Sequence, residues 1–195
     1  MTRGFRIAWV GLLSVVLAVL IAAWITVAQP WVMPLATHPP EVDAERLKAH
    51  VRRLSVDLHP RVAGPSGRLE AAADYVAGVL RESGGAVSTQ RVSVGKVRQR
   101  NLIARFGPAD GEPLVIGAHY DAHGGDDGDA TPGADDNASG VAGLLELARL
   151  LGRDPPPRPV ELVAYTLEEP PYFRTAGMGS AAHAQSLRAA AASRA

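Results

Sequence analysis

The 195-residue sequence contains no cysteine and has no net charge, because 20 Lys and Arg balance 20 Asp and Glu. Without cysteine the chain has no disulfide scaffold, no thiolate zinc site and no cysteine nucleophile, so His, Asp or Glu must hold any metal. A neutral chain also lacks the basic face with which nucleic-acid-binding proteins meet phosphates. The sequence therefore argues against a nucleic-acid partner, and its length allows one domain of ordinary size.

Acidic residues are absent before Glu41, where Arg3 and Arg6 precede an uncharged, apolar run over residues 7–28. As a helix this run would be about 33 Å long at about 1.5 Å per residue, which matches the hydrocarbon core of about 30 Å of a lipid bilayer. We expect a cytoplasmic stub at residues 1–6 and a transmembrane anchor at 7–28. The positive-inside rule then places the rest of the chain on the extracytoplasmic side of the cell membrane.

A cleaved signal peptide is the alternative interpretation of the apolar run. The apolar segment of a signal peptide is usually about 7 to 15 residues long and ends in a pattern of small residues, which Thr26 interrupts here. We therefore expect an uncleaved anchor. Residues 29–42 contain four prolines and no periodic pattern, which is typical of an extended spacer, and residues 43–195 are expected to form the domain.

Helical and strand patterns alternate after the spacer. Between residues 114 and 167 the order is strand, acidic loop, helix, strand, which is a βαβ unit. The sequence therefore predicts an α/β fold with three layers, α/β/α, around a central mixed, mostly parallel sheet. The expected helices are 43–58, 66–84 (capped by Ser66) and 139–151, and the expected strands are 86–94, 101–106, 114–120 and 160–167.

Basic residues are absent between Arg105 and Arg149, although this interval contains nine acidic residues. Within and just after it, three pairs of metal-compatible groups follow strand ends or open the connecting helix. Taken singly, each pair has an ordinary explanation as a surface pair, a helix cap or solvated residues. Ligands of α/β sheets gather beyond the carboxyl ends of the strands, however, so the pairs are expected to converge. They are His119 with Asp121, Asp135 with Asp136, and Glu168 with Glu169.

Packed carboxylates repel one another, so a cleft that holds them needs protonation, a basic partner or a metal ion. Neutral imidazole and carboxylates suit Zn²⁺, which makes a metal the best fit. Calcium is an alternative because Asp126, Asp127 and Asp129 carry hard oxygen donors. Counted from Asp127, proline falls at position six and glycine at seven, so the EF-hand pattern fails. We expect a solvated loop at residues 126–129.

Three motifs occur in order and in the contexts described above: VIGAHYDA at 115–122, PGADDNASG at 132–140 and TLEEPPYF at 166–173. Together they resemble the signatures of the co-catalytic zinc aminopeptidases, a family that includes bacterial leucyl aminopeptidases, aminopeptidase Y and glutamate carboxypeptidases. The resemblance covers roughly residues 61–183. It implies a zinc-dependent exopeptidase, anchored in the lipid bilayer here, that hydrolyses peptide bonds with two zinc ions in each active site.

The resemblance also implies a role for each residue of the site. His119 would bind one zinc ion, and Asp121 would orient its imidazole. Asp136 would bridge the two ions, and Glu169 would bind the ion that His119 does not hold. Glu168 would be the general base, taking a proton from the attacking water and passing it to the leaving amine. Adjacent side chains of an extended strand point in opposite directions, so Glu168 and Glu169 require a change of backbone conformation at the strand end.

The family supplies two further ligands, an Asp or Glu fewer than thirty residues after the ligand glutamate and a later histidine. No Asp or Glu follows Glu169, and His183, the only later histidine, lies in an alanine-rich segment where we expect a surface position. We therefore expect a carboxyl-terminally truncated copy with an incomplete sheet. The alternative function is a catalytically inactive remnant that binds at most one metal ion weakly.

Overall fold

The computed structural model describes residues 3–28, 41–64, 67–124 and 130–193, which form parts of two compact units, residues 1–39 and 40–195. The described part of the first unit is the helix α1 (Arg3–Ala28). Its segment Trp9–Ala28 is long and apolar enough to cross a membrane, and a signal sequence near an N-terminus meets the same criteria. Residues 29–40 of the expected spacer lie outside the described residues.

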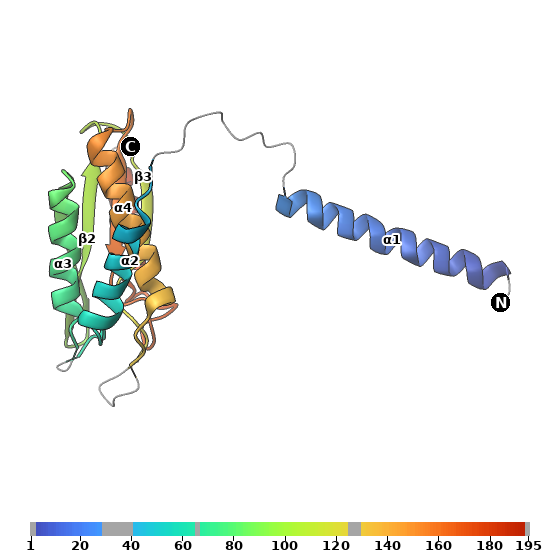
Figure 1. Ribbon diagram of the computed structural model, residues 1–195, viewed down its shortest axis with the longest axis horizontal. Coiled ribbons are helices and arrows are strands. Elements are labelled where there is room, and N and C mark those ends of the chain that lie inside the picture. The colour runs from blue at the N-terminus through green and yellow to red at the C-terminus, as the bar shows by residue number, and fades with distance from the viewer. Residues whose placement is uncertain (1–2, 29–40, 65–66, 125–129, 194–195) are drawn as a thin grey trace. The chain divides into compact units, whose positions relative to one another are not determined.

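A four-stranded sheet forms the centre of the second unit (Figure 1). The strands β1 (Ala86–Val94), β2 (Val97–Phe106), β3 (Leu114–His119) and β4 (Val160–Tyr165) lie in the order β1-β2-β4-β3. β3 and β4 pair in parallel, whereas β2 pairs antiparallel with both β1 and β4. The predicted mixed α/β sheet is confirmed, but parallel pairing is confined to β3 and β4 in the part of the chain that the structure describes.

The difference from a mostly parallel sheet comes from the β1–β2 hairpin. Its strands are joined by only two residues, Gly95 and Lys96, and Gly95 has a φ of 57°. A two-residue connection can join only antiparallel strands, and the positive φ that such turns need favours glycine. β2 also begins at Val97 instead of residue 101, because Arg98 and Arg100 interrupt the apolar pattern on which the prediction relied.

Helices α2, α3 and α4 lie together over one face of the sheet (Figure 1). α2 (Ala44–Arg52) continues into the short helix η1 (Arg53–Asp57), and α3 (Leu69–Glu82) packs on β1 and β2. α4 (Gly140–Arg153) follows the short helix η2 (Ala134–Ser139) and packs on β3 and β4. The predicted βαβ unit is thus β3–α4–β4. The predicted cap Ser66 lies outside the described residues, whereas Asp43 caps α2 by accepting the N–H groups of Glu45 and Arg46.

Alternation along the strands divides the sheet into two faces. Leu102 and Ala104 of β2 and Leu162 and Ala164 of β4 are completely buried in the core beneath α3 and α4. The intervening residues of β2 and β4 face helix α5 (Gly179–Ala192), which contacts β1 and β2. The domain therefore has the three layers, α/β/α, that the sequence predicts.

His183 is buried against the second face, and the predicted surface position is wrong. Only 3% of the residue is exposed. Its Nδ1 lies 3.1 Å from the Tyr165 hydroxyl, and its Nε2 lies 3.8 Å from the Glu161 carboxylate. Burial lowers the pKa of His183, which Glu161 opposes. The alanines around His183 suggest an exposed helix by composition, but small side chains also allow a helix to lie close to a sheet, where β4 supplies polar partners.

Asn101 joins this second face to the end of β4. Its fully buried side chain donates to the carbonyl of Gly179, at the start of α5, over 2.7 Å. Its Oδ1 accepts the N–H of Thr166, directly after β4, over 3.1 Å, and Nδ2 also donates to Gln90 of β1. The side-chain oxygen thereby supplies the acceptor for the Thr166 N–H, and the amide nitrogen joins the start of α5 to β1.

Replacing Asn101 should therefore destabilise the domain. Asn101→Ala leaves the Thr166 N–H buried without its acceptor and removes the bonds to Gly179 and Gln90, and we expect the free energy of unfolding to fall by about 1–3 kcal/mol. Urea denaturation of the full-length chain in mild detergent measures the change. Ser88→Ala, at an exposed position of β1, is the control and should change stability by less than about 0.5 kcal/mol. A loss in Asn101→Ala no larger than in the control would contradict the assignment.

Candidate metal centre

The parallel pairing of β3 and β4 places their carboxyl ends side by side. His119, the last residue of β3, pairs in register with Tyr165, the last residue of β4. The next N–H, of Tyr120, still donates to the Tyr165 carbonyl over 2.9 Å. The two strands therefore end at the same edge of the sheet, so residues just beyond each strand lie close together.

The predicted site residues meet at this edge. One potential ligand atom from each of His119, Glu168 and Glu169 lies within 4.8 Å of the others. His119 Nε2 also lies 3.0 Å from Asp136 Oδ1 and 3.6 Å from Glu168 Oε2. Asp136 reaches the cluster from η2, where its backbone is not helical (φ −111°, ψ 93°). The structure thus brings the residues together, while their individual roles stay predictions.

The buried carboxylate of Asp121 fixes the loop after β4. Its Oδ2 accepts the N–H groups of both Glu168, over 2.8 Å, and Glu169, over 3.0 Å. Its Oδ1 lies 3.6 Å from His119 Nδ1, which makes this contact electrostatic and longer than a hydrogen bond. Burial lowers the pKa of His119, but the surrounding carboxylates, led by Asp121, outweigh it and raise that pKa overall.

The backbone changes conformation directly before Glu168 and Glu169, as their different predicted roles require. β4 ends at Tyr165, and Leu167 adopts a left-handed backbone with a φ of 54°. Branched or bulky residues rarely adopt this conformation, which is typical of constrained functional loops. Glu168 and Glu169 therefore do not alternate as in a strand, and both carboxylates reach the cluster.

Several buried polar atoms of the cluster lack a hydrogen-bond partner among the described residues: His119 Nδ1, Asp121 Oδ1 and Glu169 Oε1. Such atoms cost free energy unless something compensates them. Burial raises the pKa of Glu169, and neighbouring carboxylates, Asp136 first among them, raise it further. His119 Nδ1 and Asp121 Oδ1 face each other over 3.6 Å, whereas a cation on the Nε2 side of the ring would satisfy Glu169 Oε1 and relieve the repulsion. One imidazole and several carboxylates form a donor set that suits Zn²⁺, so the residues present fit a metal.

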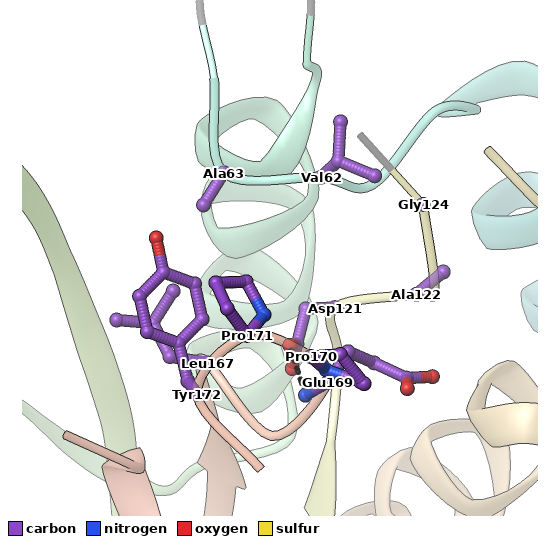
Figure 2. Close-up of a pocket in the computed structure, with 10 residues that line it drawn as sticks. All are labelled: Val62, Ala63, Asp121, Ala122, Gly124, Leu167, Glu169, Pro170, Pro171 and Tyr172. Atoms are coloured by element: carbon purple, nitrogen blue, oxygen red, sulfur yellow. Dashed lines mark hydrogen bonds between the residues drawn. The ribbon is translucent and has the colours of Figure 1, made fainter. Parts of the chain in front are cut away.

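A cavity of about 130 Å³ adjoins the cluster (Figure 2). Asp121 and Glu169 contribute to its lining, and Leu167, Pro171 and Tyr172 form an apolar part of it. Figure 2 shows Leu167 and Tyr172 together on one side, while the Glu169 carboxylate points the other way. An apolar hollow beside a few converging polar groups is the usual form of a small-molecule site. The expected loop at 126–129 lies outside the described residues.

Arg61 is a residue of this region that the sequence analysis missed. Its side chain is fully buried and donates to the carbonyls of Pro132 and Gly133, in the loop that leads to Asp136, and of Tyr120. Residues 106–148 contain no basic residue, which suggested that no positively charged side chain lies near this acidic region. The fold shows otherwise, because it brings the Arg61 side chain into contact with Pro132 and Gly133. Arg61 lies far away in the sequence, and the residues around it carry no signal that would have placed it here.

Comparison with known proteins agrees with the fold and the motifs. Residues 101–194 match Peptidase family M28. The uncharacterized protein YfbL of Escherichia coli (strain K12) is 47% identical over 176 residues, which cover 89% of this chain and 54% of YfbL. The match of residues 101–194 to a peptidase family agrees with the resemblance to zinc aminopeptidases that the motifs predict.

Three solved structures with 26–29% sequence identity share the fold. A leucine aminopeptidase precursor from Bacteroides thetaiotaomicron is 27% identical with a TM-score of 0.60, and the match covers 69% of this chain and 50% of that chain. A glutaminyl cyclase from the same species is 26% identical with a TM-score of 0.59, and the match covers 73% of this chain and 53% of that chain. A Zn-dependent exopeptidase from Parabacteroides distasonis is 29% identical with a TM-score of 0.59, and the match covers 71% of this chain and 52% of that chain. The chain thus spans about half the length of the relatives it matches.

The two hydrogen bonds of Asp121 predict a specific loss of stability. Asp121→Ala leaves the N–H groups of Glu168 and Glu169 without their acceptor, and we expect the free energy of unfolding to fall by about 2–4 kcal/mol. Asp121→Asn keeps one oxygen and should lose less. Asp135→Ala, at an exposed position near the site, serves as the control. Thermal unfolding without metal measures all three, and equal stability of Asp121→Ala and the control would contradict the role of Asp121 in holding this loop.

Proposed function

We propose that this chain is a zinc-dependent exopeptidase of the aminopeptidase type. The observation that supports it most is the convergence of His119, Glu168 and Glu169 with Asp136 at the end of the parallel strand pair. A cation there would also satisfy the buried, unpaired Glu169 Oε1. The match of residues 101–194 to Peptidase family M28 and the likeness to a Zn-dependent exopeptidase support the same chemistry. Peptides are the proposed substrates.

In this proposal His119, Asp136 and Glu169 would hold the zinc. Bound zinc polarises the substrate carbonyl and lowers the pKa of water to near 7. Asp121 has two tasks: it holds the loop of the glutamates through their N–H groups, and its charge favours the orientation of the His119 ring in which Nε2 faces the cluster.

Glu168 is the proposed general base. Its side chain is 25% exposed, so water can reach it, and its carboxylate lies 3.6 Å from His119 Nε2. It would take a proton from the attacking water and pass it to the leaving amine. Glu169 suits the ligand role because its Oε1 is buried and unpaired among the described residues. Since the Glu168 backbone is held by Asp121, only its carboxylate needs to move during proton transfer.

The roles of the two glutamates can be separated by experiment. In the full-length chain purified in mild detergent, Glu168→Gln should keep its bound zinc but lose about 10²–10⁴-fold in peptide hydrolysis, because the amide cannot accept the proton. Glu169→Gln should lose zinc as well as activity. Elemental analysis and hydrolysis of amino-acid anilides measure the two quantities, with the exposed Glu112→Gln as the control.

Each outcome of this experiment has a clear meaning. Loss of zinc in Glu168→Gln, with retention in Glu169→Gln, would show that the two roles are exchanged. Absence of zinc binding in the parent chain would contradict the proposal. One zinc ion without turnover would support the alternative function, a chain that binds a single metal through three ligands and does not catalyse. Turnover only of peptides with amino-terminal glutamine, without hydrolysis, would indicate cyclase activity instead.

We further propose that α1 is an uncleaved membrane anchor and that the peptidase domain lies on the extracytoplasmic side. The uncharged, apolar segment Trp9–Ala28 and the preceding arginines Arg3 and Arg6 support this arrangement. Full-length chain should stay with the membrane fraction after alkaline extraction and keep its intact mass. A variant without residues 3–28 is the control and should be soluble. A mass shortened at the amino terminus would show a cleaved signal peptide.

A further inference from the structure

Arg61 donates four hydrogen bonds to backbone carbonyls from a completely buried side chain. Nε donates to Tyr120 over 2.9 Å, Nη1 to Leu54 over 2.7 Å and to Pro132 over 2.9 Å, and Nη2 to Gly133 over 2.9 Å. The Arg61 carbonyl also accepts the N–H of Ala122 over 3.0 Å. A single residue thus connects η1, the turn after β3 and the loop before η2.

Two of these segments carry proposed metal ligands. Tyr120 directly follows His119, and Gly133 precedes Asp136 by three residues. The carbonyls of Tyr120 and Gly133 are held by two nitrogens of one rigid, planar group, Nε and Nη2. The guanidinium therefore fixes the separation between the two backbone segments on which His119 and Asp136 are mounted.

The placement of Asp136 depends on this backbone because its own side chain is 76% exposed. Among the described residues its carboxylate contacts His119, over 3.0 Å, and its exposure shows that packing does not hold it in place. The loop packs closely against the guanidinium: a Cβ atom added to Gly133, whose φ is 57°, would lie 2.8 Å from Arg61 Nη2 and 2.5 Å from the Asp136 carbonyl oxygen. Only glycine allows this approach.

The chemistry of arginine suits this task better than that of lysine. Three of its nitrogens donate in separate directions here, whereas an ammonium group offers its donors from one atom. Arg61 forms no ion pair within 4.0 Å among the described residues, and the negative charge of Asp121 favours its charged form against burial. The cation is thus held by carbonyls, which leaves the carboxylates of the cluster free.

We propose that Arg61 is a positioning residue that sets the spacing between His119 and Asp136 before metal binds. The inference rests on the proposed metal-binding function and adds to it a residue outside the family motifs named above. Its consequence is that zinc affinity depends on a side chain that never contacts the metal. Residues that support metal ligands from behind typically contribute about 10–100-fold to metal affinity.

Zinc affinity tests the inference directly. Arg61→Lys keeps the charge but cannot reach the separate carbonyls, and we expect the zinc Kd of the full-length chain to rise about 10–100-fold, measured by competition with a chromophoric chelator well below the melting temperature. Arg149→Lys is the matched control, because it disrupts the bonds of Arg149 to Glu146 (2.6 and 2.9 Å) away from the site. It should leave the Kd within about twofold, even where it lowers the melting temperature.

A second variant decides the matter if Arg61→Lys does not fold. Gly133→Ala keeps Arg61 but forces the loop away from the guanidinium, and we expect the Kd to rise in the same direction. A parental Kd in Arg61→Lys, or in Gly133→Ala where only that variant folds, would overturn the inference while leaving the proposed function intact. Absence of zinc binding in the parent chain would overturn the proposed function and this inference with it.

Discussion

The parallel pairing of β3 with β4 is the constraint on which the site depends. Antiparallel neighbours would send successive strand ends to opposite edges of the sheet, and His119 would lie a whole strand length away from Glu168. A parallel pair requires a crossover, which α4 provides on the face covered by α3 and α4. The crossover in turn begins at the same edge, so the helix start that carries Asp136 joins the two strand ends.

Electrostatic repulsion is the main difficulty of such an arrangement. Four carboxylates, those of Asp121, Asp136, Glu168 and Glu169, lie around His119, and burial raises the pKa of Glu169 there. Asp121 shows how part of the repulsion is relieved, since its charge is stabilised by hydrogen bonds from two backbone N–H groups and by proximity to His119. The remaining unpaired oxygens have no such compensation among the described residues, which is why a cation suits the cluster.

The sequence predicted those features that depend on neighbours along the chain. Strand and helix patterns gave the βαβ unit, and the motifs placed His119, Asp136 and the glutamates at its edge. It could not predict contacts made across the fold. The burial of His183 depends on α5 lying on the β4 face that carries Tyr165, and the role of Arg61 depends on a loop about seventy residues away in sequence. Composition gives no information about either contact.

The position of Arg61 explains why the acidic interval can lack basic residues. A lysine or arginine within residues 106–148 would be free to form ion pairs with the carboxylates and so compete with a metal for them. Arg61 instead reaches the region from behind, and its donors are taken by the carbonyls of Leu54, Tyr120, Pro132 and Gly133. Its charge still acts on Asp121 over a longer distance. The positive charge therefore stabilises the acidic loops without occupying the oxygen atoms that a metal would need.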